Sequence, residues 1–106
     1  MVQTSNKNLS SVRKFQKEIK MKIKVDKLIL FGSRAKGTFN SLSDFDLLLV
    51  SNSFKDIPWY KRSIKLYPFW KEDLPLELLC YTPEEFERKK KQMGIVQEAV
   101  KEGIEI

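Results

Sequence analysis

The order of hydrophobic and polar residues along this chain predicts helices and short strands in alternation. The first helix is expected from residue 8 to about residue 22, because apolar residues recur there at helical spacing with Lys and Arg between them. These apolar residues are Leu9, Val12, Phe15, Ile19 and Ile23. Such a helix would cover one face of a sheet. Apolar runs predict the strands, which are expected over about 25–31, 44–50 and 76–81.

A further helix, rich in aromatic residues, is predicted between the second and third strands. It should begin near Ile57-Pro58 with Asp56 as its cap, and it should end near Tyr67 because Pro68 follows. Its aromatic residues fit either core packing or an exposed surface for a partner. They are Trp59, Tyr60, Tyr67, Phe69 and Trp70.

The C-terminal part predicts two helices and a terminal edge strand. The run Thr82-Pro83-Glu84-Glu85 is a capping box, so a helix should start there and continue to Gly94. We expect Phe86 and Met93 to anchor it. A last short helix is marked by Ile95, Val96, Ala99 and Val100 and closed by Gly103, before a strand at 104–106. Alternating helices and strands indicate one α/β (α+β) sheet domain over residues 1–106.

Composition narrows the chemistry that this domain can perform. The chain has no histidine, which excludes Ser-His-Asp triads and imidazole bases and leaves acid–base work to carboxylates, Lys, Tyr or water. Its single cysteine, Cys80, lies in an apolar run and is expected to be a buried thiol. No apolar run approaches the roughly 20 residues of a membrane span, and no signal-peptide pattern opens the chain, so a cytoplasmic protein is expected.

The net charge of +6 has two interpretations. It fits anionic partners such as a triphosphate, a nucleic acid or an acidic protein, and it equally fits the Lys- and Glu-rich surface of a protein from a hot environment. The basic residues are spread over the predicted helices without an Arg-rich tract, so we do not expect nucleic-acid binding.

Candidate chemistry is concentrated in residues 28–50, LILFGSRAKGTFNSLSDFDLLLV. The first strand stops at Gly32-Ser33, a turn into a short helix of basic character whose free backbone N–H groups suit a phosphate. The second strand opens with Asp44 and Asp46. Residues two apart on a strand share a face, so their Cα atoms should lie roughly 6.5 Å apart, close enough for both carboxylates to bind magnesium. The stretch therefore predicts a site for a nucleoside triphosphate and its metal, with the turn-rich residues 38–43 delivering Asp44.

The same residues resemble a known family. Gly32-Ser33, ten intervening residues and Asp44-Phe45-Asp46 match the Gly-Ser-x10-Asp-x-Asp signature of the polymerase-β-like nucleotidyltransferase superfamily, and the whole chain resembles its minimal nucleotidyltransferases. The resemblance implies a small mixed sheet flanked by helices. It also implies a third carboxylate on a later strand, and the matching position is Glu77, where the family usually has Asp.

The resemblance assigns a role to each candidate residue. Asp44, Asp46 and Glu77 would hold magnesium, two ions in the usual arrangement, and Glu77 would help to deprotonate the acceptor hydroxyl. The nucleotide, which the resemblance suggests is ATP, would be bound through its phosphates. The residues expected to bind them are Gly32, Ser33, Arg34 and Lys36.

The resemblance also implies a partner. Larger relatives carry an additional domain that holds the acceptor, whereas nearly all of this chain is used to build the sheet and its helices. Minimal nucleotidyltransferases are often paired with an HEPN-domain RNase toxin, for which they act as antitoxin and on which they can adenylylate a tyrosine. Two alternatives stay open: a non-catalytic antitoxin whose site is vestigial because Glu77 replaces Asp, and a nucleic-acid-modifying or nucleic-acid-binding protein. Homo- or hetero-oligomerisation is left open as well.

Overall fold

A four-stranded mixed sheet forms the centre of the computed structural model, which describes residues 6–37 and 43–106. The strands follow the order β3-β2-β1-β4 across the sheet. β2 and β3 are parallel, whereas β1 is antiparallel to both of its neighbours. The bounds are β1 Lys27–Phe31, β2 Phe45–Val50, β3 Leu76–Tyr81 and β4 Ile104–Glu105. The predicted small α+β fold is therefore confirmed.

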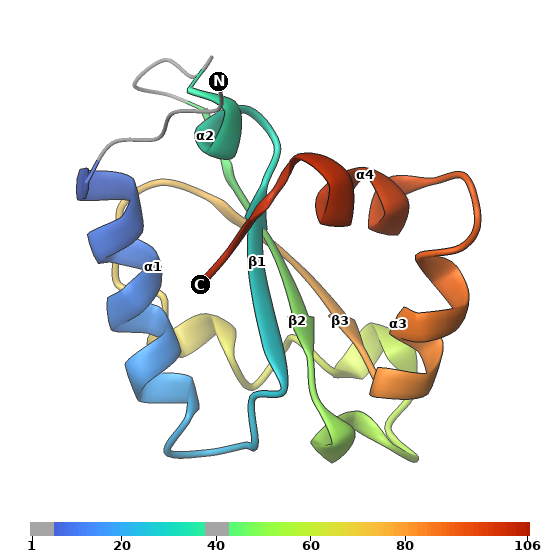
Figure 1. Ribbon diagram of the computed structural model, residues 1–106. Helices are drawn as coiled ribbons and strands as arrows, with labels where there is room; N and C mark the ends of the chain where they lie inside the picture. The colour runs from blue at the N-terminus through green and yellow to red at the C-terminus, as the bar shows by residue number, and fades with distance from the viewer. Residues whose placement is uncertain (1–5, 38–42) are drawn as a thin grey trace.

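Helices cover the two faces of this sheet (Figure 1). The first helix lies against one face, and the two C-terminal helices lie against the other. A one-turn helix follows β1 at the end of the sheet. The bounds of these helices are α1 Asn6–Ile19, α2 Ser33–Lys36, α3 Pro83–Lys89 and α4 Ile95–Glu102. The predicted N-terminal helix is confirmed, although it ends at Ile19 rather than near residue 22.

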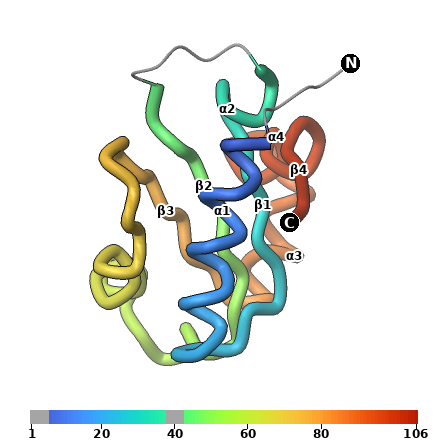
Figure 2. Tube along the Cα trace, turned by 90° about the vertical axis from the view of Figure 1, so that its left-hand side faces the viewer, coloured from blue at the N-terminus to red at the C-terminus, as the bar shows by residue number. Residues whose placement is uncertain are grey.

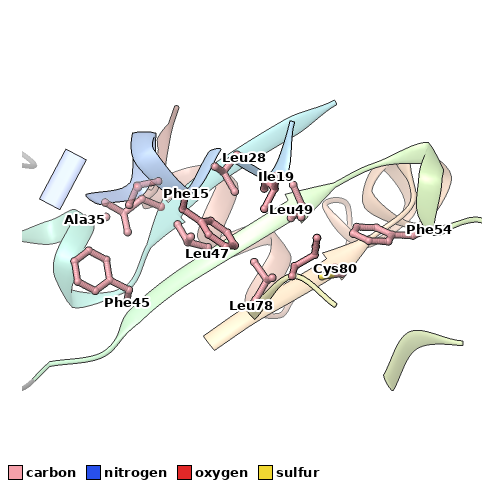
Figure 3. Close-up of a cluster of buried hydrophobic side chains, with 13 residues drawn as sticks. Phe15, Ile19, Leu28, Ala35, Phe45, Leu47, Leu49, Phe54, Leu78 and Cys80 are labelled. Atoms are coloured by element: carbon pink, nitrogen blue, oxygen red, sulfur yellow. The ribbon is translucent and has the colours of Figure 1, made fainter. Parts of the chain in front are cut away.

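Alternation along β2 decides which side chain faces which layer. Phe45, Leu47 and Leu49 are buried with Phe15 and Ile19 of α1 (Figure 3). The residues of opposite parity, Leu48 and Val50, are buried against the face that α3 and α4 cover. Because side chains alternate along a strand, Asp46 belongs to the α3–α4 face, at the beginning of β2.

The helix predicted from residue 57 was wrong. The segment instead contains the 3₁₀ turn η2 Trp59–Lys61 and the start of η3 Tyr67–Phe69, and a further 3₁₀ turn, η1 Asn52–Phe54, precedes it. Pro68 lacks the N–H that a continuing helix needs. Asp56, the expected cap, has a positive φ of 67°.

The aromatic residues of this segment divide between the core and the surface. Trp70 packs edge-on against Phe15 and Phe45, with ring centroids 5.6 and 4.9 Å apart. Trp59 and Tyr60, by contrast, are 57% and 68% exposed. Core packing is thus confirmed for Trp70, whereas Trp59 and Tyr60 are exposed and their use as a partner surface stays a prediction.

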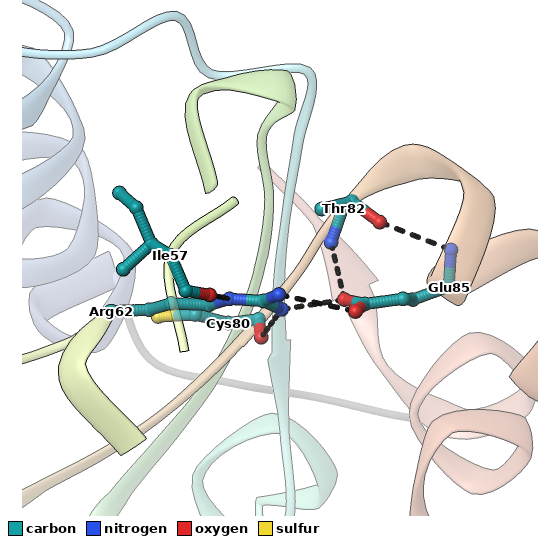
Figure 4. A network of polar contacts seen from close by, with 5 residues as sticks. All are labelled: Ile57, Arg62, Cys80, Thr82 and Glu85. Carbon is teal, nitrogen blue, oxygen red and sulfur yellow. Dashed lines mark hydrogen bonds and ion pairs between the residues drawn. The ribbon is translucent and has the colours of Figure 1, made fainter. Parts of the chain in front are cut away.

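A buried arginine fastens the irregular segment to the sheet (Figure 4). Arg62 donates hydrogen bonds from Nε to the carbonyl of Ile57 (2.9 Å) and from Nη1 to the carbonyl of Cys80 (3.2 Å). Both terminal nitrogens also bind the carboxylate of Glu85, which accepts a hydrogen bond from the N–H of Thr82 at 2.9 Å. This arrangement joins η2 to the end of β3 and the start of α3.

The outer edge of β3 is covered by the same segment (Figure 2). The N–H of Leu78 donates to the hydroxyl of Tyr67 at 3.3 Å. An uncovered edge strand is a template for unwanted pairing, so this contact shields a backbone group that would otherwise face solvent.

The C-terminal predictions are mostly confirmed. Thr82 and Glu85 form the predicted capping box, and the terminal strand pairs with β1. Met93 was wrongly expected to anchor the preceding helix: α3 ends at Lys89, and the Met93 side chain is 94% exposed. Val96 and Ala99 are the buried residues of α4, whereas Ile95 and Val100 are exposed.

Three further expectations concern the loop at 38–43, the crossing of a membrane and the environment of Cys80. Of the turn-rich loop predicted at 38–43, all but Ser43 lies outside the described residues. Among the helices of residues 6–37 and 43–106, none combines the length and the apolar character that crossing a membrane requires. Cys80 is a free, buried thiol, and burial raises its pKa to about 12, which makes it chemically inert.

Candidate active site

The sheet register places two of the predicted carboxylates side by side on neighbouring strands. Asp46 pairs with Phe31 of β1 on one side and with Glu77 of β3 on the other. Because β2 and β3 are parallel and in register at this pair, Asp46 and Glu77 project from the same face of the sheet. Asp44 directly precedes β2 and is exposed, two residues from Asp46. The structure thus gathers all three predicted acidic residues at one end of the sheet.

The surroundings of Asp46 shift the pKa of its carboxyl group. Its carboxyl is partly buried, and its pKa is raised from 3.8 to about 6, with burial as the largest cause. The negative charges of Glu77 and Asp44 and a hydrogen bond with Glu77 add to the upward shift. A protein that crowds acidic groups in this way prepares a place where a bound cation is favoured.

The carboxylates of Asp44, Asp46 and Glu77 are of the ligand type that magnesium prefers. Carboxylate oxygens are the hard ligands that Mg²⁺ prefers, and two or three of them with water and substrate phosphates complete its coordination. Within the described residues, no group of three or more Asp, Glu or Cys side chains is already arranged to hold an ion. Asp44, Asp46 and Glu77 therefore fit a metal by type and by position, and their side chains would have to converge on it.

A glycine turn lies directly against the Asp46 carboxylate. Gly32 has a φ of +74°, and a Cβ at this position would overlap Asp46 Oδ2 and lie 3.1 Å from its Cγ. Glycine is therefore required twice, by the backbone conformation and by the close approach. Ser33 follows as the first residue of α2 and is partly buried. The turn and the carboxylates form one continuous site.

Arg34 has a different environment from the one that a phosphate ligand needs. Its side chain is 5% exposed. The guanidinium donates to the carbonyl of Ser43 from Nε (3.2 Å) and Nη2 (2.9 Å) and to Asn8 Oδ1 from Nη1 (3.1 Å). It also lies over the ring of Phe45, 4.6 Å from the centroid. Arg34 thus holds the backbone carbonyl before Asp44 and packs over the side chain of Phe45 after it, a role that sequence patterns could not reveal because Asn8 belongs to a distant helix.

Lys36 is engaged at the opposite side of α2. Its Nζ forms an ion pair with Glu102 of α4 at 2.7 Å, and this hydrogen bond raises the lysine pKa. Both side chains are about half exposed. An exposed pair of this kind contributes little stability, so Lys36 can exchange Glu102 for a phosphate at small cost.

Similarity to known proteins agrees with this geometry. The model of the nucleotidyltransferase domain family matches residues 12–102, a range that includes the glycine turn and all three carboxylates. The chain belongs to this family. A crystal structure of a candidate nucleotidyltransferase from Sulfolobus solfataricus is similar to this nucleotidyltransferase domain, with a TM-score of 0.60 and 20% sequence identity over 99% of this chain and 89% of that one. At this identity the likeness shows the fold alone. A search among curated proteins gives no significant match.

Proposed function

We propose that this nucleotidyltransferase domain transfers a nucleotide, AMP from ATP, to a hydroxyl group on a partner protein in a magnesium-dependent reaction. The observation that carries the proposal is the register of β2 and β3, which sets Asp46 opposite Glu77 beneath the Gly32 turn. A triphosphate at the turn would lie next to the carboxylates that hold its metal. Positioning and charge neutralisation are the main contributions of a protein to such transfers.

The reaction would proceed as an in-line displacement. The acceptor oxygen forms a bond to the α-phosphorus, the bond from that phosphorus to the bridging oxygen of the β-phosphate breaks, and pyrophosphate leaves. The proton of the acceptor hydroxyl passes to a carboxylate. Glu77 is exposed whereas Asp46 is partly buried, so Glu77 is the better placed to meet an incoming hydroxyl and to accept its proton.

The remaining residues would bind substrate and metal. Asp44, Asp46 and Glu77 would hold the magnesium ions, which neutralise charge on the triphosphate and on the departing pyrophosphate. Gly32 allows close approach of the phosphates, Ser33 would bind them through its hydroxyl and N–H, and Lys36 would add a positive charge. Arg34 would contact neither substrate nor metal and would act indirectly, by holding the carbonyl of Ser43 next to Asp44.

The acceptor would come from another chain. The buried hydrophobic residues of this domain lie in the two layers on either side of the sheet, and Glu77 is exposed. The resemblance to minimal nucleotidyltransferases suggests that the partner is an HEPN-domain protein and that this chain is its antitoxin.

A second candidate function is a non-catalytic antitoxin that inhibits by contact alone. Two observations favour it. Arg34 and Lys36 both have protein partners, and no group of three ligands is preformed within the described part of the chain. Glu77, one methylene longer than the family's usual Asp, adds to this argument.

The decisive experiment uses ATP labelled on its α-phosphate. The protein is incubated with magnesium and the HEPN-domain product of a neighbouring gene, and label on that product is measured. Wild type should transfer label, the double variant Asp44→Asn/Asp46→Asn should not, and Asp56→Asn, an acidic residue in the loop after β2, should behave as wild type. Inhibition of the RNase without any label would instead establish the second candidate.

A further inference from the structure

A hollow with an apolar floor lies at the end of the molecule opposite the active site. Its volume is about 230 Å³. Ile23, Phe54, Ile57 and Leu66 provide apolar lining, while Lys61 and Lys65 line it with positive charge. We call it the lysine-rimmed hollow. It follows directly after β2, in which the four residues that follow Asp46 span about 13 Å.

The segment that forms this hollow exposes more apolar surface than a monomer needs. Trp59, Tyr60 and Ile64 are 57%, 68% and 61% exposed, and Ile57 at the hollow itself is 38% exposed. Single exposed apolar residues are ordinary, but several within one short segment beside an apolar hollow mark an interaction surface. Aromatic residues are also enriched where proteins bind one another.

The backbone under this surface is held in place. Arg62 binds the carbonyls of Ile57 and Cys80 and the carboxylate of Glu85, so the turn between Ile57 and Arg62 is tied to β3 and α3 (Figure 4). A surface that is ordered before a partner arrives loses less conformational entropy on binding. The exposed side chains are therefore presented on a rigid support.

Charge indicates which kind of partner fits. The charge of Arg62 is compensated by Glu85, but within the described residues neither Lys61 nor Lys65 has an ion-pair partner. The uncompensated charge at the rim is positive. A second copy of this chain, with a net charge of +6, would be repelled. An acidic surface would be attracted.

We propose that the lysine-rimmed hollow binds an acidic segment of a partner protein, which inserts a large apolar side chain and places carboxylates against Lys61 and Lys65. Ile23, Ile57 and Leu66 of the lining are aliphatic and Phe54 is only 2% exposed, so the hollow offers little aromatic surface on which a nucleic-acid base could stack and favours a protein side chain. A partner held here leaves the active site open, and the inference does not depend on the proposed transfer reaction.

The test begins with a phage-displayed library of random peptides. The full-length protein is the bait, and peptides that also bind the double variant Lys61→Glu/Lys65→Glu are removed. Enriched peptides should be acidic and contain a large apolar residue. Measured by fluorescence polarisation, their affinity should fall at least ~10-fold in Lys61→Glu/Lys65→Glu and in Ile57→Ser, as expected when a charge pair or an apolar anchor is lost.

A matched control separates the hollow from general electrostatics. Lys14→Glu/Lys17→Glu makes the same change of charge on exposed positions of α1, and it should leave peptide affinity unchanged. The proposal is overturned by enrichment of neutral or basic peptides, by no enrichment, or by equal loss of affinity in the control. It is also overturned if the hollow variants abolish binding to polyuridylate or dissociate a homodimer, because the surface would then serve another occupant. Thermal unfolding confirms that each variant folds.

Discussion

At the scale of single residues, Asp46 carries the strongest conflict between stability and function. Its carboxyl is pressed against Gly32, partly buried, and surrounded by the charges of Glu77 and Asp44. Nothing in this environment stabilises the ionised form. Residues that lower the stability of a fold are retained at sites where a ligand compensates, and a metal ion is the ligand that would compensate here.

The pH dependence of stability should expose this conflict. The pKa of Asp46 rises from 3.8 in the unfolded chain to about 6 on folding, so its contribution to stability is full below pH 3.8 and is lost as pH rises through about 6. Asp46→Asn removes the ionisable group. The variant should therefore melt at a higher temperature than wild type near neutral pH in metal-free buffer, and the two should converge toward pH 4.

Metal addition provides the control for this prediction. Magnesium with ATP should raise the melting temperature of wild type by mass action and should leave Asp46→Asn nearly unaffected. Asp56→Asn, the same substitution in a loop at the other end of the sheet, should show the wild-type response. A metal response that survives in Asp46→Asn would contradict the placement of the metal.

Gly32→Ala tests the close approach between the turn and the carboxylate. The new Cβ would overlap Asp46 and force a backbone conformation that alanine avoids, at an expected cost of about 1–3 kcal/mol. Displacing Asp46 by even 1 Å should lower transfer about 100-fold. Gly94→Ala is the matched control, because Gly94 also has a positive φ but has open space around its Cβ position. It should lose stability without losing transfer.

At the scale of elements, the sequence predicts what local patterns determine and fails where distant elements decide. The strands and the capping box at Thr82 follow from spacing and were correct, whereas Asp44, expected to open the second strand, directly precedes it. The helix expected after residue 57 failed because Arg62 ties the segment to the carbonyls of Ile57 and Cys80, contacts that come from the fold and not from local spacing. The environment of Arg34 was equally hidden, since its partner Asn8 comes from α1.

Arg34 provides an element-scale prediction, because it connects α1, α2 and the start of β2. Arg34→Met should keep much of the apolar packing over Phe45 and lose the hydrogen bonds to Ser43. The magnesium concentration for a half-maximal shift in melting temperature should then rise about 10-fold, as is typical when a residue supporting a metal ligand is removed. Arg34→Lys should recover little, because lysine lacks the planar fork.

A control variant distinguishes positioning from general loss of stability. Arg88→Met removes an exposed arginine of α3 and should leave the magnesium requirement unchanged. If Arg34→Met is less stable but requires no more magnesium than wild type, Arg34 supports the fold without positioning Asp44.

The Arg62–Glu85 pair should stabilise the junction of η2, β3 and α3. Arg62→Met leaves Glu85 without its main partner and frees two backbone carbonyls, so it should cost about 2–4 kcal/mol, less than in a dry interior because Glu85 keeps some contact with water. The Arg62 hydrogen bond lowers the pKa of Glu85 from 4.5 to about 2. This stabilisation is therefore present above pH 4.5 and lost as pH falls toward 2.

Denaturant unfolding at several pH values measures both effects. The difference between wild type and Arg62→Met should be constant near neutral pH and should shrink in acid. Glu87→Gln, which breaks the exposed pair with Lys90, should leave the unfolding midpoint almost unchanged. A similar loss of stability in Arg62→Met and Glu87→Gln would show that the buried Arg62–Glu85 network stabilises the fold no more than an exposed ion pair does.

At the scale of the whole molecule, the two proposals would divide function between the two ends of one small sheet. The glycine turn and the acidic residues occupy the beginning of β2, and the lysine-rimmed hollow occupies its end. The two faces between them are filled by α1 on one side and by α3 and α4 on the other. On these proposals the domain would bind a nucleotide at one end and a partner at the other, so substrate binding and transfer to the acceptor would be separable properties.

Glu77 is the residue at which these two properties should separate. Glu77→Gln keeps Asp44, Asp46 and the glycine turn, so the shift in melting temperature with magnesium and ATP should be largely retained. Transfer to the partner should nevertheless fall at least ~10²-fold, the usual contribution of a positioned general base. Glu77→Asp restores the residue usual in the resembled family and should transfer at least as fast as wild type. Single-turnover measurements with saturating partner, magnesium and ATP compare the three proteins. Equal rates for wild type and Glu77→Gln would show that Glu77 is only an exposed charge on β3, whereas transfer in Glu77→Asp alone would show that the natural site is vestigial.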